Sequence, residues 1–219
     1  MSGPDPCRAR HFGLYPAVVV DLVDPDDLGR VEVRLPSLGL TGDEDVRAWA
    51  TVLSPYADDD QGFLALPEVG SQVVVGFEAG DPRRPYMVGA AWNGREAPPA
   101  TAAAANDIRV LKSRSGSVLR FDDGDPGAVV TLATAAGHTL TLNAATDTVE
   151  VAHANGCRLT ITAAGAVEIQ ATNTVEVTAA ALNVHAATAT FDGLVNCTTL
   201  IASSAVVSPS YTPGAGNVW

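Results

Sequence analysis

The sequence predicts an all-β protein in which a small barrel is followed by a rod of stacked strands. In the first part of the chain, short runs of β-branched and aromatic residues alternate with turn signals, and no amphipathic helical pattern is visible. From Gly116 to Phe191 one small unit repeats, with two aliphatic residues flanking a polar one and a short Ala/Thr/Gly/Asn bridge after them. Alternation with a period of two is the sequence signature of a β-strand.

The predicted barrel strands are separated by turn dipeptides such as Asp24-Pro25 and Asn93-Gly94. Proline and glycine at such positions end strands and reverse the chain. Five or six short strands in about eighty residues predict a small closed barrel, and an OB-type barrel fits the count. The strand-like runs are Tyr15–Val23, Arg30–Leu35, Val46–Leu53, Phe63–Leu66, Gln72–Phe77 and Tyr86–Trp92.

The repeated unit predicts where the core of the rod lies. In each unit the two aliphatic residues face one way and the middle residue faces the other. The first residues of successive units lie 9, 10, 8, 8 and 7 positions apart, and a repeat this short cannot bury its own apolar face. It must stack on itself or on partner chains. The residues expected in this core are Leu140, Leu142, Val149, Val151, Leu159, Ile161, Val167, Ile169, Val175, Val177, Leu182 and Val184.

The repeat length bears on how many chains build the rod. A single chain wound into a solenoid needs about three faces per coil, with a period near 18–24 residues, whereas three chains wound together permit a period near eight. Only the short period is visible, and no aromatic residue occurs between Phe121 and Phe191, which suits a narrow lumen. Periodicity alone does not establish three chains.

Composition divides the chain into five predicted segments. A short arm precedes the barrel, and a Pro/Ala-rich linker separates the barrel from the needle of stacked strands. After Phe191 the spacing of aliphatic residues loosens, so we expect a tail that serves as a platform at the tip, with a disordered terminus as the alternative. The predicted boundaries are 1–13 for the arm, 14–94 for the barrel, 95–107 for the linker, 108–191 for the needle and 192–219 for the tail.

Charge and cysteine usage exclude several classes of function. The formal net charge is −12 with no basic run, which argues against a nucleic-acid partner because phosphate binding needs clustered Lys and Arg. Cys7, Cys157 and Cys197 are odd in number and widely spaced, which argues against a disulfide framework or a zinc site. We expect Cys157 and Cys197 to act as small buried hydrophobic residues. No signal peptide and no apolar run of about 18 residues is visible, which predicts assembly in the cytoplasm.

No pattern of residues predicts an active site, a cofactor or a metal. His138 and His185 flank strand units, and one interpretation places them with their symmetry mates on a threefold axis as metal ligands; we favour a solvent-facing or turn position. The carboxylates of 58–60 and 122–125 lack the ligand spacing of a calcium loop and are interpreted as turn residues. No serine or cysteine stands in a nucleophile motif. We therefore expect a structural protein rather than an enzyme.

Over residues 14–99, five motifs occur in order at 29–36, 48–51, 62–70, 73–85 and 89–94. Together these motifs resemble the OB domain of contractile-tail spike proteins. That family includes baseplate assembly protein V of phages, the cell-puncturing spikes of larger phage tails and the spike half of VgrG proteins. The short β-repeats that follow resemble the family's triple-stranded β-helix, to about Phe191. The residues that carry the barrel resemblance are Gly29, Arg30, Pro67, Glu68, Gly70, Asp81, Pro82, Arg84, Pro85, Trp92 and Gly94.

The resemblance implies a homotrimer whose needle is an intertwined triple-stranded β-helix. It further implies docking to a hub protein at the end of a contractile tube, and transient contact with a target membrane when the sheath contracts and the spike punctures the envelope. No lysozyme domain separates barrel from needle and no long hub domain precedes the barrel, so the hub and a PAAR-like tip protein are expected to be separate chains. Phage tail, secretion system and free injection particle stay open.

Two other functions fit the sequence less well than the spike. A trimeric fibre or adhesin that binds a cell-surface glycan would require a cluster of exposed aromatic residues, and both Trp49 and Trp92 lie in predicted strands. A hydrolase or lyase would require an acidic pair in a cleft, and Glu150, Glu168 and Glu176 are spread along the rod instead.

Overall fold

The structure is a computed structural model that describes residues 10–39 and 45–208. Part of the predicted arm (1–9) and the end of the predicted tail (209–219) lie outside the described residues. The chain divides into two compact units, with the boundary between Thr172 and Asn173. The first unit contains a barrel and a flat antiparallel sheet, and the second has no assigned strand among its described residues.

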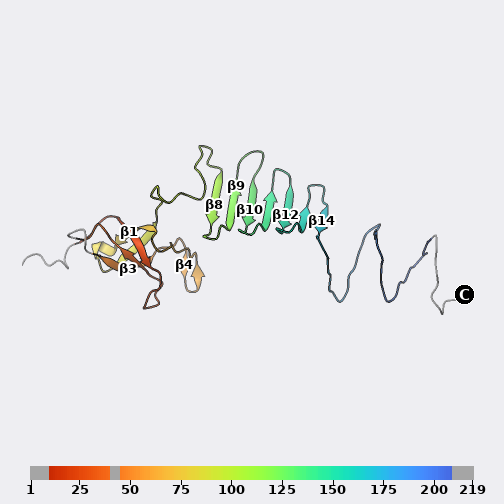
Figure 1. Ribbon diagram of the computed structural model, residues 1–219, viewed down its shortest axis with the longest axis horizontal. Coiled ribbons are helices and arrows are strands. Elements are labelled where there is room, and N and C mark those ends of the chain that lie inside the picture. The colour runs from red at the N-terminus through yellow and green to blue at the C-terminus, as the bar shows by residue number, and fades with distance from the viewer. Residues whose placement is uncertain (1–9, 40–44, 209–219) are drawn as a thin grey trace, which may run out of the picture. The chain divides into compact units, whose positions relative to one another are not determined.

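The barrel is closed by five strands in the order β1-β2-β3-β7-β6 (Figure 1). Every neighbouring pair is antiparallel except β3 and β7, which run parallel. This arrangement is OB-like and confirms the predicted barrel. The strands are β1 (Tyr15–Asp21), β2 (Val31–Arg34), β3 (Arg47–Val52), β6 (Gln72–Phe77) and β7 (Pro85–Ala90).

Alternate residues of the barrel strands point into one small aliphatic core. In β2, for example, Val31 and Val33 are fully buried while Glu32 and Arg34 between and after them are half-buried at the surface. The pattern repeats in β1 and β6, as the pleat of a strand requires. The buried core consists of Ala17, Val19, Val31, Val33, Leu35, Ala50, Val73, Val75 and Met87.

The segment between β3 and β6 differs from the prediction. The run Phe63–Leu66 was expected to be a strand, but the structure has none there; instead a two-residue hairpin forms just before it, from β4 (Ala57–Asp58) and β5 (Gln61–Gly62). Leu64 is 81% exposed, and the backbone N–H of Phe63 donates to Tyr56 O at 2.9 Å beside the hairpin. Between β6 and β7 a short 3-10 turn, η2 (Glu78–Gly80), reverses the chain.

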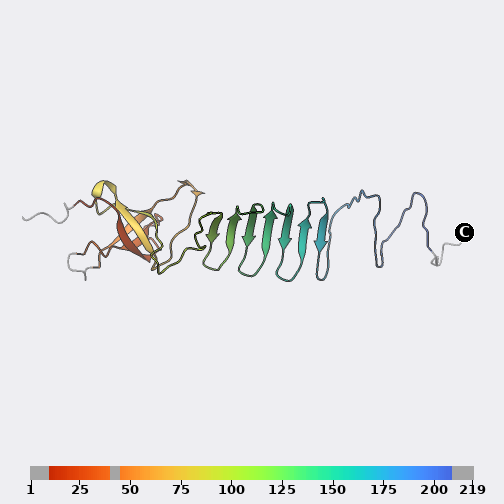
Figure 2. The same cartoon turned by 90° about the horizontal axis from the view of Figure 1, so that it is seen from above.

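After the linker, seven strands form an antiparallel meander in sequence order, here called the ladder (Figure 2). Each of the five inner strands pairs with the strands before and after it in the same chain, and β8 and β14 form the two edges. Its strands are β8 (Ile108–Lys112), β9 (Val118–Asp122), β10 (Val129–Ala133), β11 (Thr139–Asn143), β12 (Thr148–Ala152), β13 (Arg158–Ile161) and β14 (Val167–Gln170).

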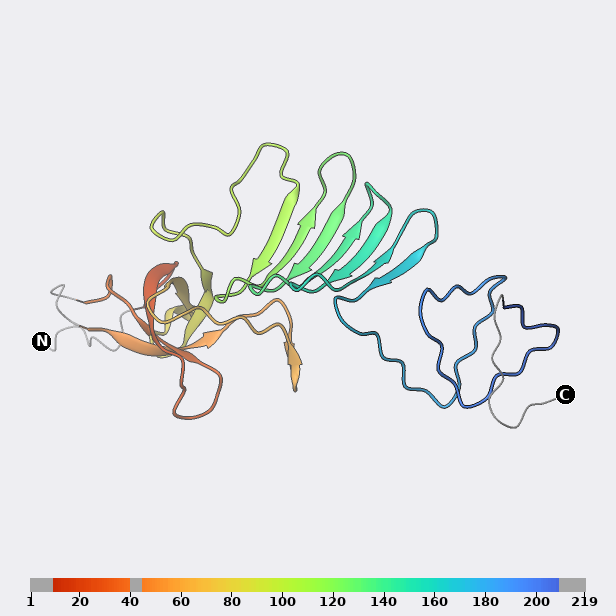
Figure 3. The same ribbon diagram turned by 45° about the vertical axis from the view of Figure 1, so that its right-hand side comes forward.

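The ladder ends at Gln170, earlier than the repeat in the sequence. The units Val175–Val177 and Leu182–Val184 were expected to form two further strands, and the single chain has no strand there. In Figure 3 this part of the chain runs as extended legs joined by bends. Every residue from 173 to 208 is exposed, and no strand is assigned among these residues. The predicted extent of the needle, 108–191, therefore stays a prediction for the assembled protein.

Candidate functional site: the turn network, the pocket and the apolar face

The motif residues of the barrel build its turns. Gly29 has a φ of +69°, a left-handed conformation that favours glycine, and it places Arg30 to reach back to Asp24. Arg30 Nε and Nη2 donate to the two carboxylate oxygens of Asp24 at 2.8 and 2.7 Å, and the guanidinium lies 5.9 Å from the ring centre of Trp49. These hydrogen bonds hold the pKa of the Asp24 carboxyl well below its usual range. The Arg30–Asp24 pair is therefore a structural clamp on this turn.

The connection from β6 to β7 is closed in the same way. The backbone N–H of Asp81 donates to Glu78 O, and that of Arg84 donates to Asp81 O. Hydrogen bonds from Arg83 lower the pKa of Asp81 to about 2, while Arg84 pairs with Glu78 at 3.1 Å. Pro82 stands inside this turn, and Pro85 is buried as the first residue of β7. The motif Gly-Asp-Pro-Arg-Arg-Pro is thus a self-contained reverse turn.

The remaining motif residues lie at two other turns. Gly70, with a φ of +93°, donates its N–H to Val19 O across the start of β6. Glu68 pairs with Arg114 at 3.0 Å, both side chains being largely exposed. Pro67 lies just before Glu68, and Gly94 has a left-handed φ after Trp92. None of these residues is held near a nucleophile or an acid–base pair.

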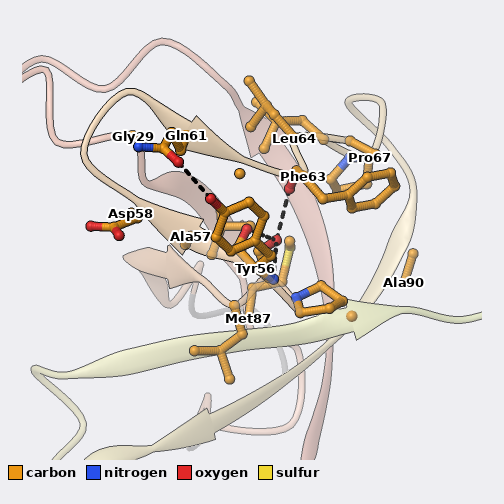
Figure 4. A pocket seen from close by; sticks show the side chains of 18 of the residues that line it. Gly29, Tyr56, Ala57, Asp58, Gln61, Phe63, Leu64, Pro67, Met87 and Ala90 are labelled. Carbon is orange, nitrogen blue, oxygen red and sulfur yellow. Dashed lines mark hydrogen bonds between the residues drawn. The ribbon is translucent and has the colours of Figure 1, made fainter.

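A pocket of about 870 Å³ opens on the barrel beside the β4–β5 hairpin (Figure 4). Its walls carry three exposed aromatic rings: Trp92 is 68% exposed, Tyr56 53% and Phe63 52%. Leu64 and Met87 supply further apolar surface. The expectation that Trp92 lies inside a strand is wrong, because β7 ends at Ala90. An exposed aromatic cluster therefore does exist.

The hairpin that borders this pocket is held by its own hydrogen bonds. The Ser54 hydroxyl lies 2.9 Å from Tyr56 O and 2.7 Å from Phe63 O, and the Tyr56 hydroxyl donates to Gln61 Oε1 at 2.8 Å. At Gly62, a Cβ atom would come within 2.7 Å of Tyr56 O, so only glycine fits. The pocket wall is thereby fixed without help from a ligand.

The register of the ladder places the predicted core residues on one surface, here called the apolar face. Leu140 pairs with Val151, which pairs with Leu159, which pairs with Ile169; in parallel, Leu142, Val149, Ile161 and Val167 form a second row. The rows continue toward β9 through Leu132 with Leu119 and through Val130 with Phe121. The face is uncovered in one copy: Val167 and Ile169 are 63% and 64% exposed. The other four predicted core residues, Val175, Val177, Leu182 and Val184, lie beyond the ladder.

The middle residues of the units form a polar row on the opposite surface of the ladder. Thr141 pairs with Glu150, Glu150 with Thr160, and Thr160 with Glu168. The Arg158 guanidinium lies 3.8 Å from Glu150, a separation typical of a weak surface ion pair. Over β11–β14 the register puts each aliphatic pair and its middle residue on opposite surfaces of the sheet.

His138, His153 and Cys157 lie at turns of the ladder, while His185 and Cys197 lie on exposed chain. His138 and His153 stack with ring centres 4.1 Å apart, and His185 is exposed. Cys157 is half-buried and Cys197 exposed, so neither is the buried thiol expected; Cys7 lies outside the described residues. Hydrogen bonds from Thr172 lower the pKa of the Cys157 thiol.

Residues 10–39 and 45–208 lack two features that other functions would need, a metal-ligand group and a membrane-spanning helix. Within these residues no group of three or more His, Cys, Asp or Glu side chains is placed to hold a metal ion. The same part of the chain contains no helix with the length and apolar character of a membrane span.

Residues 15–92 match the family described as the Type VI secretion system/phage-baseplate injector OB domain. The chain is 31% identical over 91 residues to the actin cross-linking toxin VgrG1 of Vibrio cholerae serotype O1, covering 41% of this chain and 8% of the toxin. It is 34% identical over 92 residues to the Type VI secretion system spike protein VgrG5 of Pseudomonas aeruginosa, covering 39% and 12%. With spike protein VgrG3 of Vibrio cholerae serotype O1 it shares 32% over 75 residues, covering 34% and 7%.

The barrel thus resembles injector OB domains, as the motifs predicted. Beyond that class, the chain resembles VgrG-type baseplate and spike proteins in particular. The chain spans between 7% and 12% of the length of these three relatives.

Proposed function

We propose that this protein is the structural central spike of a contractile injection machine and that it acts as a homotrimer. The observation that carries the proposal is the pairing of an injector-type OB barrel with a ladder whose two-row apolar face is left uncovered. Burying one Val, Leu or Ile side chain is worth about 1.5–3 kcal/mol. Three ladders that turn these faces toward one axis make a closed, dry prism.

The mechanical role follows from that assembly. In the prism, strands are paired along the whole rod and their apolar side chains interlock, which makes unfolding slow. Slow unfolding is the property that a puncturing rod needs when a contracting sheath drives it through an envelope. The barrel end of each copy docks to a hub protein at the tube end. The far end, including the tail 192–219, carries a separate PAAR-like tip protein. We assign no enzymatic step to the chain.

The proposal is tested by the place of the chain in assembled particles. Antibody or nanogold labelling of a tag on the full chain is expected to mark the baseplate end of contractile particles, and deleting the chain is expected to abolish those particles. Particles that assemble and contract normally without it would contradict the spike role. In particles with residues 193–219 removed, we expect the trimer to persist and the tip protein to be lost.

One observation favours a second candidate, a trimeric fibre that binds a cell-surface glycan. Trp92, Tyr56 and Phe63 present exposed rings around the barrel pocket, and aromatic faces commonly stack against sugars or anchor proteins. Glycan binding that Trp92→Ala abolishes, without loss of particle assembly, would support the fibre. Loss of hub binding in the same variant would instead assign the pocket to docking within the spike.

A further inference from the structure

The apolar face carries one charged residue, and that residue lies on the first strand of the ladder. In the register of β8 and β9, Arg109 is the partner of Phe121 and Leu111 is the partner of Leu119. Residues directly opposite each other in an antiparallel pair point to the same side of the sheet. Arg109 therefore begins one row of the apolar face, and Leu111 begins the other. Over β9–β14 both rows consist of Val, Leu, Ile and Phe.

A second arginine close by lies on the opposite surface and provides a comparison. Arg120 on β9 is the partner of Val110, so its side chain alternates with the apolar rows. Its guanidinium is matched by a carboxylate, since Arg120 Nη2 lies 2.7 Å from Asp122 Oδ2. Among the strands β8–β14, only position 109 puts a charge on the apolar face.

The Arg109 guanidinium has little to bind within one copy. Its Nη1 donates to the backbone O of Asn106, and no carboxylate among residues 10–39 and 45–208 pairs with it. A guanidinium carries five N–H donors in a planar fork, so most of these donors face water in the single chain. When the apolar face is covered, that water is displaced. A charge that loses its water without gaining a partner is costly, so Arg109 requires an anion.

In the proposed trimer, three copies of this side chain meet at one end of the prism. Strand β8 pairs only with β9 and is an edge of the ladder, as Figure 1 shows. Arg109 therefore lies in the outermost layer, where the prism is open to solvent and an ion can enter. Threefold symmetry puts the three guanidiniums at equal distances from the axis, and like charges held together repel. The rows of the apolar face contain no Asp or Glu to offset that repulsion.

We propose that the three Arg109 side chains bind one tetrahedral oxyanion, of the phosphate or sulfate class, on the threefold axis at the β8 end of the prism. Symmetry selects this ligand. With one P–O bond along the axis, a phosphate presents its other three oxygens to three equivalent guanidiniums, whereas a carboxylate has no threefold symmetry. Guanidinium N–H groups bind phosphate oxygens through strong charge-assisted hydrogen bonds. This inference rests on the proposed homotrimer and adds a ligand that holds its chains together at one end.

The site has a consequence for the stability of the assembly. It exists only where three copies meet, so the oxyanion binds the trimer and not the single chain. A ligand that binds only the assembled state stabilises that state by mass action. Phosphate is therefore expected to raise the temperature at which the trimer dissociates. Sodium chloride at the same ionic strength screens the three charges without bridging them, and it is expected to have a smaller effect.

The test uses the purified full chain in a phosphate-free chloride buffer at pH 7, after light scattering has given its native mass. Calorimetric titration with sodium phosphate counts the bound anions, and thermal melting in phosphate and in chloride gives the shift in dissociation temperature. Arg109→Gln removes the guanidinium from the apolar face. The matched control, Arg120→Gln, removes the same group from the opposite surface of the next strand. Arg109→Leu continues the apolar row and serves as a second variant if glutamine impairs assembly.

For the wild type and Arg120→Gln, we expect one phosphate per three chains and a higher dissociation temperature in phosphate than in chloride. For the Arg109 variants, we expect trimers that have lost both responses. A wild-type trimer that binds no phosphate, binds one per chain or gains equally from chloride overturns this inference and leaves the homotrimer standing. Arg109 variants that still bind one phosphate per trimer do the same. A native mass of one copy overturns the homotrimer and the inference with it.

Discussion

Arg30 clamps Asp24 across the turn that joins β1 to β2, with two guanidinium nitrogens on the two carboxylate oxygens at 2.8 and 2.7 Å. The same carboxylate accepts the backbone N–H groups of Asp26, Leu28 and Arg30, each at 3.1 Å. The Asp24 side chain is only 3% exposed, so its charge is matched by donors rather than by water. Charge-assisted bonds of this kind are stronger than neutral ones.

Replacing Asp24 with alanine is expected to lower the melting temperature of the barrel, because three backbone N–H groups and a guanidinium lose their acceptor. Asp24→Asn keeps the shape but removes the charge, and it is expected to have a smaller effect. The measurement is thermal unfolding followed by the fluorescence of Trp49 and Trp92, both in the barrel segment. Equal melting temperatures for the wild type and Asp24→Ala would contradict the clamp.

The same carboxylate predicts how the barrel responds to acid. Because the pKa of Asp24 is lowered in the folded state, its stabilising effect is present above the unfolded value of about 4 and is lost as the pH falls through the folded pKa. Asp81, with a pKa of about 2, acts in the same direction. The melting temperature is therefore expected to fall between pH 4 and pH 2, and Asp24→Asn is expected to flatten part of that decline. An unchanged decline in the variant would show that other groups cause it.

The barrel core is predicted to be sensitive at Leu35. This side chain is 1% exposed, and truncating a buried leucine to alanine typically costs about 2–5 kcal/mol in the free energy of unfolding. Leu53→Ala, at a position that is 49% exposed, is the matched control and is expected to cost far less. Urea denaturation measures both. Similar losses in the free energy of unfolding for the two variants would contradict the assignment of Leu35 to the core.

The ladder turns are predicted to depend on their glycines. Gly137 has a φ of +87°, and a Cβ there would meet Ala154 Cβ at 3.6 Å, an ordinary contact. Gly137→Val is therefore expected to destabilise through backbone strain, by about 1–3 kcal/mol per copy, and Gly137→Asn by less because asparagine tolerates this conformation. Hydrogen exchange of the β10 and β11 amides reports the difference. Full tolerance of valine would show that the turn relaxes to another form.

The apolar face is tested by a pair of adjacent substitutions. Val167→Asp puts a carboxylate on the face proposed to line the prism, where an unpaired charge costs several kcal/mol per copy, and it is expected to block assembly. Glu168→Thr changes the polar row and is expected to leave assembly nearly unchanged. Size-exclusion chromatography compares the two. Equal tolerance of both changes would contradict the assignment of the faces.

Much of the fold was predictable because alternation is a local signal. The predicted run Gln72–Phe77 coincides with β6, and the units that begin at Leu140, Val149 and Leu159 fall on three consecutive strands of the ladder. A period of two also fixes which residues share a face, so the apolar face was predictable before any coordinate was known.

Other features depend on pairing that the pattern does not encode. The strands of the β4–β5 hairpin are two residues long, too short to show a period, while the apolar run Phe63–Leu66 forms no strand. The units Val175–Val177 and Leu182–Val184 look like the earlier ones, yet no strand is assigned to them. Trp92 looked like a strand residue because the apolar run continues past Ala90, where β7 ends. The pocket that its ring lines brings together separate segments, which no local pattern predicts.

The mass of the purified full-length chain in solution tests the central claim most directly. Light scattering at micromolar concentration is expected to give three times 22.5 kDa, and the species is expected to persist in mild detergent, because the apolar faces of three ladders are buried against one another. A mass of 22.5 kDa under these conditions would contradict the trimeric spike, since a single copy leaves its apolar face and its unpaired legs in water.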